Sequence, residues 1–125
     1  MLPAYQVVGL TKALTATATS SGTSFTPAEC NAAFSGTRGP YYLKITNGSA
    51  ADNIFFVTDT TAPTAVIPTA GTPGSCAIPA YGEVIVQIAG AGGLLPVVPV
   101  YIAVVAANSS PVYVTPVLLA AFVGP

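Results

Sequence analysis

Carboxylates and thiols are the side chains that could do chemistry in this chain, and they are few. Histidine is absent from the 125 residues. The acidic residues and cysteines are Glu29, Cys30, Asp52, Asp59, Cys76 and Glu83. General acid–base catalysis and most zinc sites rely on histidine or on grouped carboxylates. We therefore expect a protein that is not an enzyme and has no catalytic residues, no cofactor and no bound metal.

The charged residues have ordinary structural explanations, and none is predicted to converge on another. Glu29 follows Thr26 and Pro27 in the pattern of a capping box, which favours a helix cap over a catalytic role. Asp52 and Asp59 bracket one predicted strand and could share a weakly bound calcium ion, but turn residues are the favoured interpretation.

Two interpretations of the cysteines remain open. Cys30 and Cys76 cannot form a zinc site by themselves, because such a site needs four ligands. Buried free thiols are the favoured interpretation. The alternative is a disulfide, which would add roughly 3–4 kcal/mol to the stability on a chain-entropy estimate.

The charge content points to a protein that acts through its surfaces. Only 6% of the residues are charged, whereas about 25% is usual, and the formal net charge is −1. Neither a basic footprint for nucleic acid nor an uninterrupted membrane-spanning run is present. The first residues show no signal peptide, so we expect synthesis in a cytoplasm. A surface of Thr, Ser, Ala, Val and Pro suits packing against other subunits.

The elements that would position these residues are predicted to be strands. Twelve glycines, twelve prolines and many Thr and Val residues predict one all-β domain over residues 1–125, with about eight strands and one short helix near 27–35. The predicted strands are 5–19 with a break near Gly9, 41–46, 53–58, 64–67, 75–78, 83–88, 100–106 and 112–115.

Two of these strand pairs are predicted as hairpins, namely 41–46 with 53–58 and 100–106 with 112–115. Strand 53–58 is apolar on both faces, which indicates cover by the core on one side and by a neighbouring subunit on the other. The N-terminal arm 1–19 and the apolar tail 117–125 are expected to reach across subunits.

Five short motifs follow one another in the sequence from Tyr41 onward. Their residues are Tyr-Tyr-Leu-Lys-Ile-Thr-Asn-Gly, Asn-Ile-Phe-Phe-Val-Thr, Cys-Ala-Ile-Pro-Ala-Tyr-Gly-Glu-Val-Ile-Val, Val-Tyr-Ile-Ala-Val-Val-Ala and Pro-Val-Tyr-Val-Thr-Pro. Over residues 41–116 this order resembles the small β-sandwich structural proteins of tailed-bacteriophage virions, of the capsid decoration or cement type. This chain departs from their "I-P-A-G" turn, because Tyr81 is inserted before Gly82.

The resemblance implies a jelly-roll-like antiparallel sandwich. It also implies a structural virion protein on the capsid surface that binds the major capsid protein or other virion subunits and forms a homo-oligomer, with a trimer favoured. The expected interface residues are Tyr5, Val7, Tyr42, Phe55, Phe56, Tyr81, Tyr113, Leu118, Leu119 and Phe122. The alternative is a carbohydrate- or receptor-binding module of a phage fibre or adhesin, which would use Tyr-bearing loops.

Overall fold

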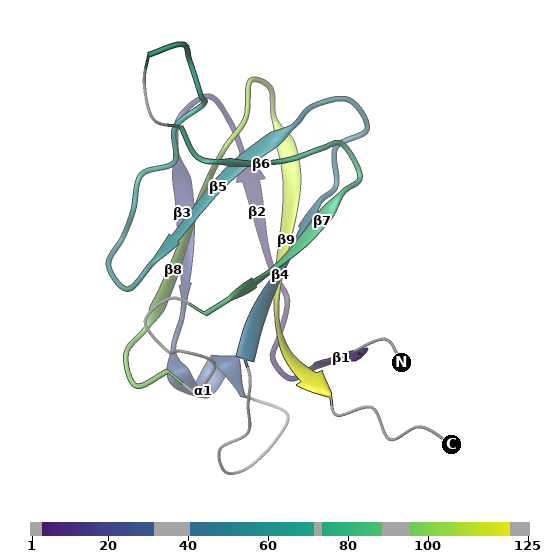
Figure 1. The fold of residues 1–125 in the computed structure, drawn as a ribbon, viewed down its shortest axis with the longest axis vertical. Helices are drawn as coiled ribbons and strands as arrows, with labels where there is room; N and C mark the ends of the chain where they lie inside the picture. The colour runs from purple at the N-terminus through teal and green to yellow at the C-terminus, as the bar shows by residue number, and fades with distance from the viewer. Residues whose placement is uncertain (1–3, 32–40, 72–73, 89–95, 121–125) are drawn as a thin grey trace.

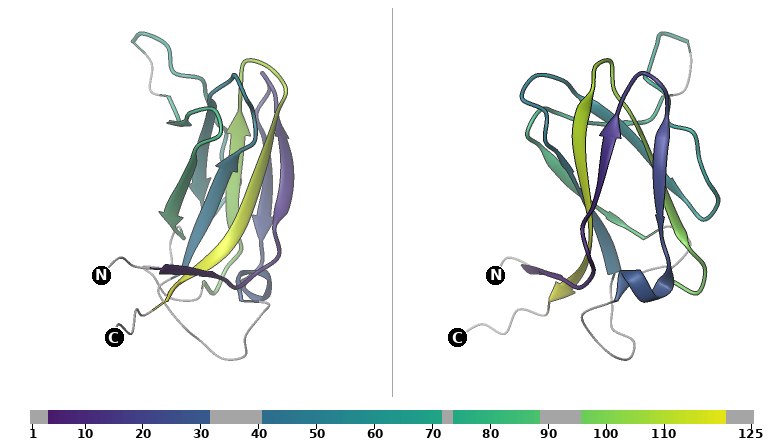
Figure 2. Two further views of the ribbon diagram at one scale, coloured as in Figure 1. Left: turned by 90° about the vertical axis from the view of Figure 1, so that its right-hand side faces the viewer. Right: turned by 180° about the vertical axis from the view of Figure 1, so that it is seen from behind.

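The computed structural model describes residues 4–31, 41–71, 74–88 and 96–120, and these residues form two antiparallel sheets packed face to face (Figures 1 and 2). The first sheet contains β1 (Ala4–Val7), β2 (Lys12–Ala16), β4 (Tyr41–Asn47), β7 (Glu83–Gln87) and β9 (Ser110–Ala120). The second contains β3 (Ser21–Phe25), β5 (Ile54–Asp59), β6 (Cys76–Ile78) and β8 (Val100–Val105). The predicted all-β sandwich is confirmed.

The strand order is that of a jelly roll. The first sheet runs β2-β9-β4-β7 and the second runs β3-β8-β5-β6. Four pairs are nested along the chain: β2 with β9, β3 with β8, β4 with β7, and β5 with β6. This is the pattern of one long antiparallel ribbon wrapped into two layers, and it places both edges of each sheet at the sides of the sandwich.

Both predicted hairpins are wrong. β4 and β5 belong to different sheets, and so do β8 and β9, so the connections 48–53 and 106–109 cross from one sheet to the other. Each connection has enough residues to span the roughly 10 Å between packed sheets. The alternating pattern identifies the strands and their inner faces, but it carries no information about the distant partner of each strand.

The core lies between the sheets and follows the predicted alternation. On β4, Tyr41, Leu43 and Ile45 are buried, whereas the intervening side chains are partly exposed. On β7, Val84 and Val86 pack against the same core. The predicted break near Gly9 is also confirmed, because β1 ends at Val7 and β2 begins at Lys12.

The segments that were expected to act as arms pair with each other over their described parts. β1 pairs with residues 117–120 of β9, and β2 pairs with residues 110–114 of the same strand. Both segments therefore complete the first sheet of their own chain.

The second apolar face of β5 is covered by the chain itself. Phe55 and Val57 pack against a small cluster that contains Ala65, Ala103 and Val105. Residues 64–67 form no strand, contrary to the prediction. Instead Val66 accepts a hydrogen bond from the Ser75 backbone N–H at 2.9 Å and donates its own N–H to Ser75 Oγ at 3.0 Å. The outer layer is thus a loop held by a few hydrogen bonds.

The predicted helix is present as α1 (Pro27–Cys30) and begins with the expected capping box. Thr26 Oγ1 accepts from the Glu29 N–H at 3.2 Å, and the Thr26 N–H donates to Glu29 Oε1 at 3.0 Å. The helix ends at Cys30, because Asn31 has left the helical region with φ −139°. It is therefore shorter than the predicted 27–35, of which residues 32–35 lie outside the described residues.

Candidate functional site

An ion pair that the sequence did not reveal lies at one end of the sandwich. Lys12 Nζ stands 2.7 Å from Glu29 Oε2, so the cap of α1 is joined to β2. The expectation that no charges converge is wrong here, because the wrapping of the ribbon brings β2 beside the end of β3. We call α1 together with the loops 8–11 and 96–99 the α1 end of the molecule.

Lys12 reaches this position because it points toward the interior. On β2 it lies opposite Val114, which is fully buried, so both side chains project toward the second sheet. Its ammonium donates to the Ser24 carbonyl at 2.6 Å and lies 4.8 Å from the centroid of the Phe25 ring. An inward lysine at this place occupies a backbone acceptor of edge strand β3 and protects that edge from pairing with another strand.

The electrostatics of this end favour structure over catalysis. The hydrogen bond from Lys12, with the Thr26 N–H second, lowers the pKa of Glu29 below its usual value. Burial, with the Glu29 carboxylate second, raises the pKa of the Cys30 thiol to about 11. A thiol of that pKa stays protonated at neutral pH and is a poor nucleophile.

The remaining charged residues of the described chain have local partners. Lys44 Nζ and Glu83 Oε2 are 3.8 Å apart on the outer face of the first sheet. Asp52 Oδ1 accepts from Asn108 Nδ2 at 3.2 Å, and Asp59 Oδ1 accepts from the Thr60 N–H at 2.6 Å. Asp52 and Asp59 stand before and at the end of β5, and no group of three potential metal ligands occurs among the described residues.

Both cysteines are free thiols in the structure, and the disulfide alternative is not realised. Cys30 is buried in α1, whereas Cys76 is exposed in β6. Figure 1 shows these two elements toward opposite ends of the sandwich. The prediction of buried thiols therefore holds for Cys30 and is wrong for Cys76, which takes an exposed position on an edge strand.

The residues expected at an interface divide into surface and core. Val7, Tyr81 and Tyr113 are exposed, and Tyr42 and Phe55 are half-buried. Phe56 and Leu118 belong to the core, because each points between the sheets, and their assignment to an interface is corrected. Tyr5 and Leu119 lie in paired strands, but their side chains, like all of Phe122, lie outside the described residues.

Sequence reasoning missed four exposed apolar side chains: Val66 in the loop before β6, and Leu10, Val97 and Val98 in segments near α1. Val97 is 92% exposed, and it precedes β8, whose first residue pairs with Phe25 beside α1. Leu10 belongs to the loop in which Gly9 lies against the Glu29 carbonyl. Leu10, Val97 and Val98 therefore lie at the α1 end, and Val7 of β1 directly precedes loop 8–11. In the sequence, Leu10, Val97 and Val98 each stand next to a glycine or a proline, which could have indicated an exposed apolar residue in a connection.

Tyr81 is held in a backbone conformation that favours glycine. The Gly82 N–H donates to the Pro79 carbonyl at 2.8 Å, which closes a four-residue turn with Tyr81 in its third position. Its φ is +56°, as in a type II turn, where glycine is usual at this position. The side chain is 72% exposed, so the strained backbone gains no packing of the ring in return.

A buried amide fixes this turn. Asn47 is fully buried, and its Nδ2 donates to the carbonyls of Asp52, Ile78 and Pro79 at 2.8, 3.0 and 3.1 Å. Its backbone N–H donates to the Gly82 carbonyl at 2.9 Å. The loops 48–53, 79–82 and 106–109 form what we call the turn end, and Asn47 connects the first two.

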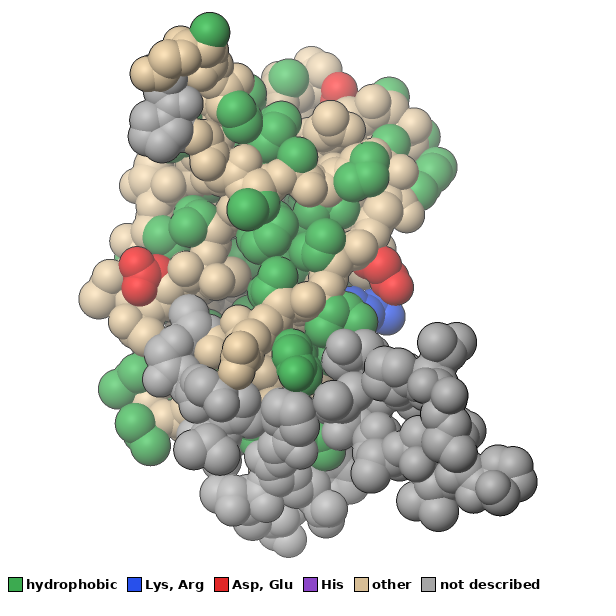
Figure 3. All heavy atoms as spheres, viewed as in Figure 1, with side chains coloured by type: hydrophobic (Ala, Val, Ile, Leu, Met, Phe, Trp, Pro, Cys, Tyr) green, Lys and Arg blue, Asp and Glu red, His purple; other side chains and the backbone are tan. Residues whose placement is uncertain are grey.

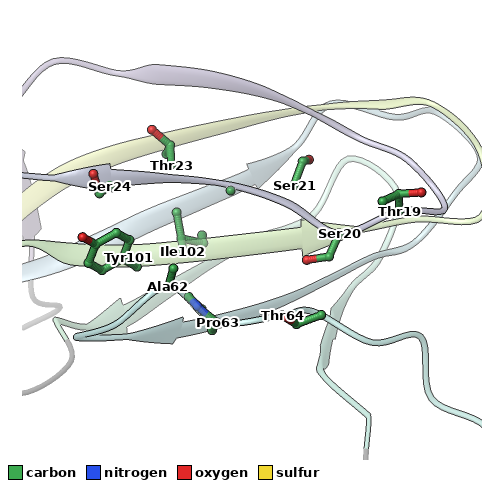
Figure 4. A pocket seen from close by; sticks show the side chains of 11 residues that line it. Thr19, Ser20, Ser21, Thr23, Ser24, Ala62, Pro63, Thr64, Tyr101 and Ile102 are labelled. Atoms are coloured by element: carbon green, nitrogen blue, oxygen red, sulfur yellow. The ribbon is translucent and has the colours of Figure 1, made fainter.

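A groove of about 630 Å³ runs beside β3 on the outer side of the second sheet (Figure 4). One wall is β3 with the residues before it, the other is the segment 62–64, and Tyr101 and Ile102 of β8 lie between them. Among the described residues that line it, none is charged. It was not predicted, because its walls come from three distant segments.

Comparisons with known proteins add no relative: no family model, no curated protein and no solved structure matches this chain. Among the described residues, no helix has the length and apolar character required to cross a membrane.

Proposed function

We propose that this chain is a structural protein of a virion, a capsid decoration or cement protein that binds the phage head and associates with itself. The observation that supports this most is the exposure of four apolar side chains, Val7, Leu10, Val97 and Val98, in segments near α1 on a body that carries few charges. Figure 3 shows one face of that body, on which few Lys, Arg, Asp or Glu side chains are visible among the described residues. Exposed apolar side chains at one end of a domain are candidates for burial in an assembly.

The fold fits this role as a rigid spacer. The edge strands of its second sheet are short or protected: β6 has three residues, and the Ser24 carbonyl of β3 is occupied by Lys12. Such protection directs association away from open strand pairing and toward side-chain contacts at the ends of the sandwich. A stable contact of this kind buries roughly 1,200 Å² or more in total. The α1 end is the candidate for that contact.

Cryo-electron microscopy of virions whose genome encodes this chain tests the proposal. We expect density for the jelly roll on the outer surface of the head, in groups of three copies. Virions that lack the protein, or a position inside the tail, would overturn the proposed role. Light scattering of the purified chain should give a mass about three times the 12.4 kDa of one copy.

A matched pair of variants identifies the associating surface. Val97→Asp and Ala107→Asp each add one carboxylate at an exposed loop position, the first at the α1 end and the second at the turn end. We expect Val97→Asp to shift the chain toward the monomer and Ala107→Asp to leave the mass unchanged. If both variants behave alike, the α1 end is not the interface.

A further inference from the structure

The groove beside β3 exists because small residues meet on the outer face of the second sheet. Gly22 lies opposite Ala103, and Ser24 lies opposite Tyr101, so these two pairs share that face. A Cβ at Gly22 would lie 2.5 Å from the Ile102 carbonyl oxygen, so the close approach of β3 to β8 requires glycine. Because Gly22 has no side chain, the bottom of the groove is open at this position, and Tyr101 lies beside it.

The second wall is fixed in place by a hydrogen bond. The Ala65 N–H donates to Ser20 Oγ at 2.9 Å, which joins the covering segment to the residue before β3. Ala65 is buried against the outer face of β8. In Figure 4 Ser20 points toward the segment that contains Pro63 and Thr64, whereas Ser21 and Thr23 point away from it. The groove is thus a formed feature with two anchored walls.

The lining has one chemical character. The described lining consists of Ser and Thr residues, one tyrosine, one proline, one glycine, one alanine and one isoleucine. A hydroxyl that faces the groove can donate one hydrogen bond and accept two, and no charged side chain is among the described lining residues. The volume of about 630 Å³ falls within the roughly 300–1,000 Å³ that is typical of small-ligand sites.

From this lining we infer that the groove binds a neutral oligosaccharide, with the Tyr101 ring beside a sugar ring and the hydroxyls of Ser20, Ser24 and Thr64 exchanging hydrogen bonds with sugar hydroxyls. A neutral oligosaccharide both donates and accepts hydrogen bonds along its length, which matches the hydroxyl groups of the groove wall. The aromatic face supplies apolar contact for the C–H groups of a sugar. This site is separate from the α1 end, so it stands or falls independently of the proposed virion role.

An extended peptide is the weaker alternative. Peptides that join a sheet do so through the free backbone groups of an edge strand. Here the Ser24 carbonyl of β3 already accepts from Lys12, and Ser21 Oγ donates to the Thr15 carbonyl of β2 at 3.1 Å. The side of β3 is thus occupied by β2, and the groove offers side chains instead of a free strand edge.

The test is titration of the intact chain with maltotetraose, cellotetraose, chitotetraose and a galactose tetramer, followed by calorimetry and by NMR of the backbone amides. We expect at least one neutral tetramer to bind and to shift amides of residues 20–24, 62–64 and 101–102. The inference is overturned if none of the four tetramers binds. It is also overturned if the chain binds only charged oligosaccharides, such as sulfated or sialylated ones, or only peptides.

Two variants make the test specific. Thr64→Trp fills the groove from an exposed position, and Thr61→Trp places the same side chain three residues earlier, outside the lining. We expect binding at least tenfold weaker for Thr64→Trp and unchanged for Thr61→Trp, with equal melting temperatures for both. Tyr101→Ala should weaken binding more than Tyr101→Phe, because the ring supplies the larger contact. Equal affinity of Thr64→Trp and wild type would contradict the assigned location.

Discussion

The two ends of the sandwich hold the ribbon in place by different means. At the α1 end, Lys12 and Glu29 form an ion pair with side chains 30% and 40% exposed. At the turn end, Asn47 is fully buried and makes only uncharged hydrogen bonds. Salt screens a half-exposed ion pair, and a change in pH can remove one of its charges. A buried amide is insensitive to both, but leaving its hydrogen-bonding groups unpaired costs free energy. The ends should therefore respond differently to the same perturbations.

Asn47→Ala should have the largest effect. The substitution leaves the carbonyls of Asp52 and Ile78 without their buried donor, and it removes the link between the two turns. We expect the free energy of unfolding to fall by about 2–4 kcal/mol. Urea denaturation measures it, and Asn53→Ala at an exposed position serves as the control. A loss below 1 kcal/mol would remove the distinction between the ends.

Lys12→Met should have a smaller effect at the opposite end. Methionine keeps most of the apolar stem but loses the bonds to Glu29 and to the Ser24 carbonyl. We expect a loss of about 1 kcal/mol in dilute buffer, and the difference from wild type should shrink in 1 M salt. The loss caused by Asn47→Ala should not depend on salt, and a salt dependence shared by both variants would contradict the comparison.

Cys30 reports on opening of the α1 end, with Cys76 as the internal reference. At pH 8 a thiol reagent should modify exposed Cys76 in the native protein and leave Cys30 unmodified, because burial raises the pKa of Cys30 to about 11. Mass spectrometry follows both sites. Lys12→Met should accelerate modification of Cys30 and leave that of Cys76 unchanged, whereas equal acceleration at both sites would indicate global destabilisation.

Acid should weaken the α1 end before the turn end. The pKa of Glu29 is lower in the folded chain than in the unfolded one, because Lys12 and the Thr26 N–H favour the carboxylate. Its contribution is therefore complete above the unfolded pKa of about 4.3 and is lost as the pH falls through the lower folded value. Thermal unfolding between pH 6 and 2.5 should show a smaller decline for Glu29→Gln. An identical decline would assign acid sensitivity to other carboxylates.

Tyr81→Gly should change stability least. Glycine adopts the positive φ of this turn without strain, which stabilises the folded chain, but it also increases the conformational entropy of the unfolded chain. Because these effects oppose each other, we expect the free energy of unfolding to change by less than about 1 kcal/mol. Tyr81→Ala keeps the strain and should be about 1 kcal/mol less stable than Tyr81→Gly. If Tyr81→Gly is clearly destabilising, the ring packs more firmly than its 72% exposure indicates.

The sequence predicted local features and missed the relations between distant segments. The capping box at Thr26 and the inward faces of 41–46 and 83–88 depend on neighbouring residues, and the structure confirms them. The partner of each strand, the Lys12–Glu29 pair and the groove depend on how the ribbon wraps. Burial of Phe56 was missed for the same reason, because a strand apolar on both faces does not reveal which face meets the core.

The nested pairing also determines how this chain must fold. The inner pairs, β5 with β6 and β4 with β7, join segments close in sequence, whereas Lys12 must find Val114 almost the length of the domain away. The entropy of loop closure favours formation of the inner pairs first, and the pairing of β2 with β9 is slow because these strands are far apart in the sequence. β9 pairs with β1, β2 and β4, so the first sheet stays open until this late segment arrives. We expect nascent chains to expose β4 during synthesis, which makes rapid completion of β9 the step that protects them from aggregation.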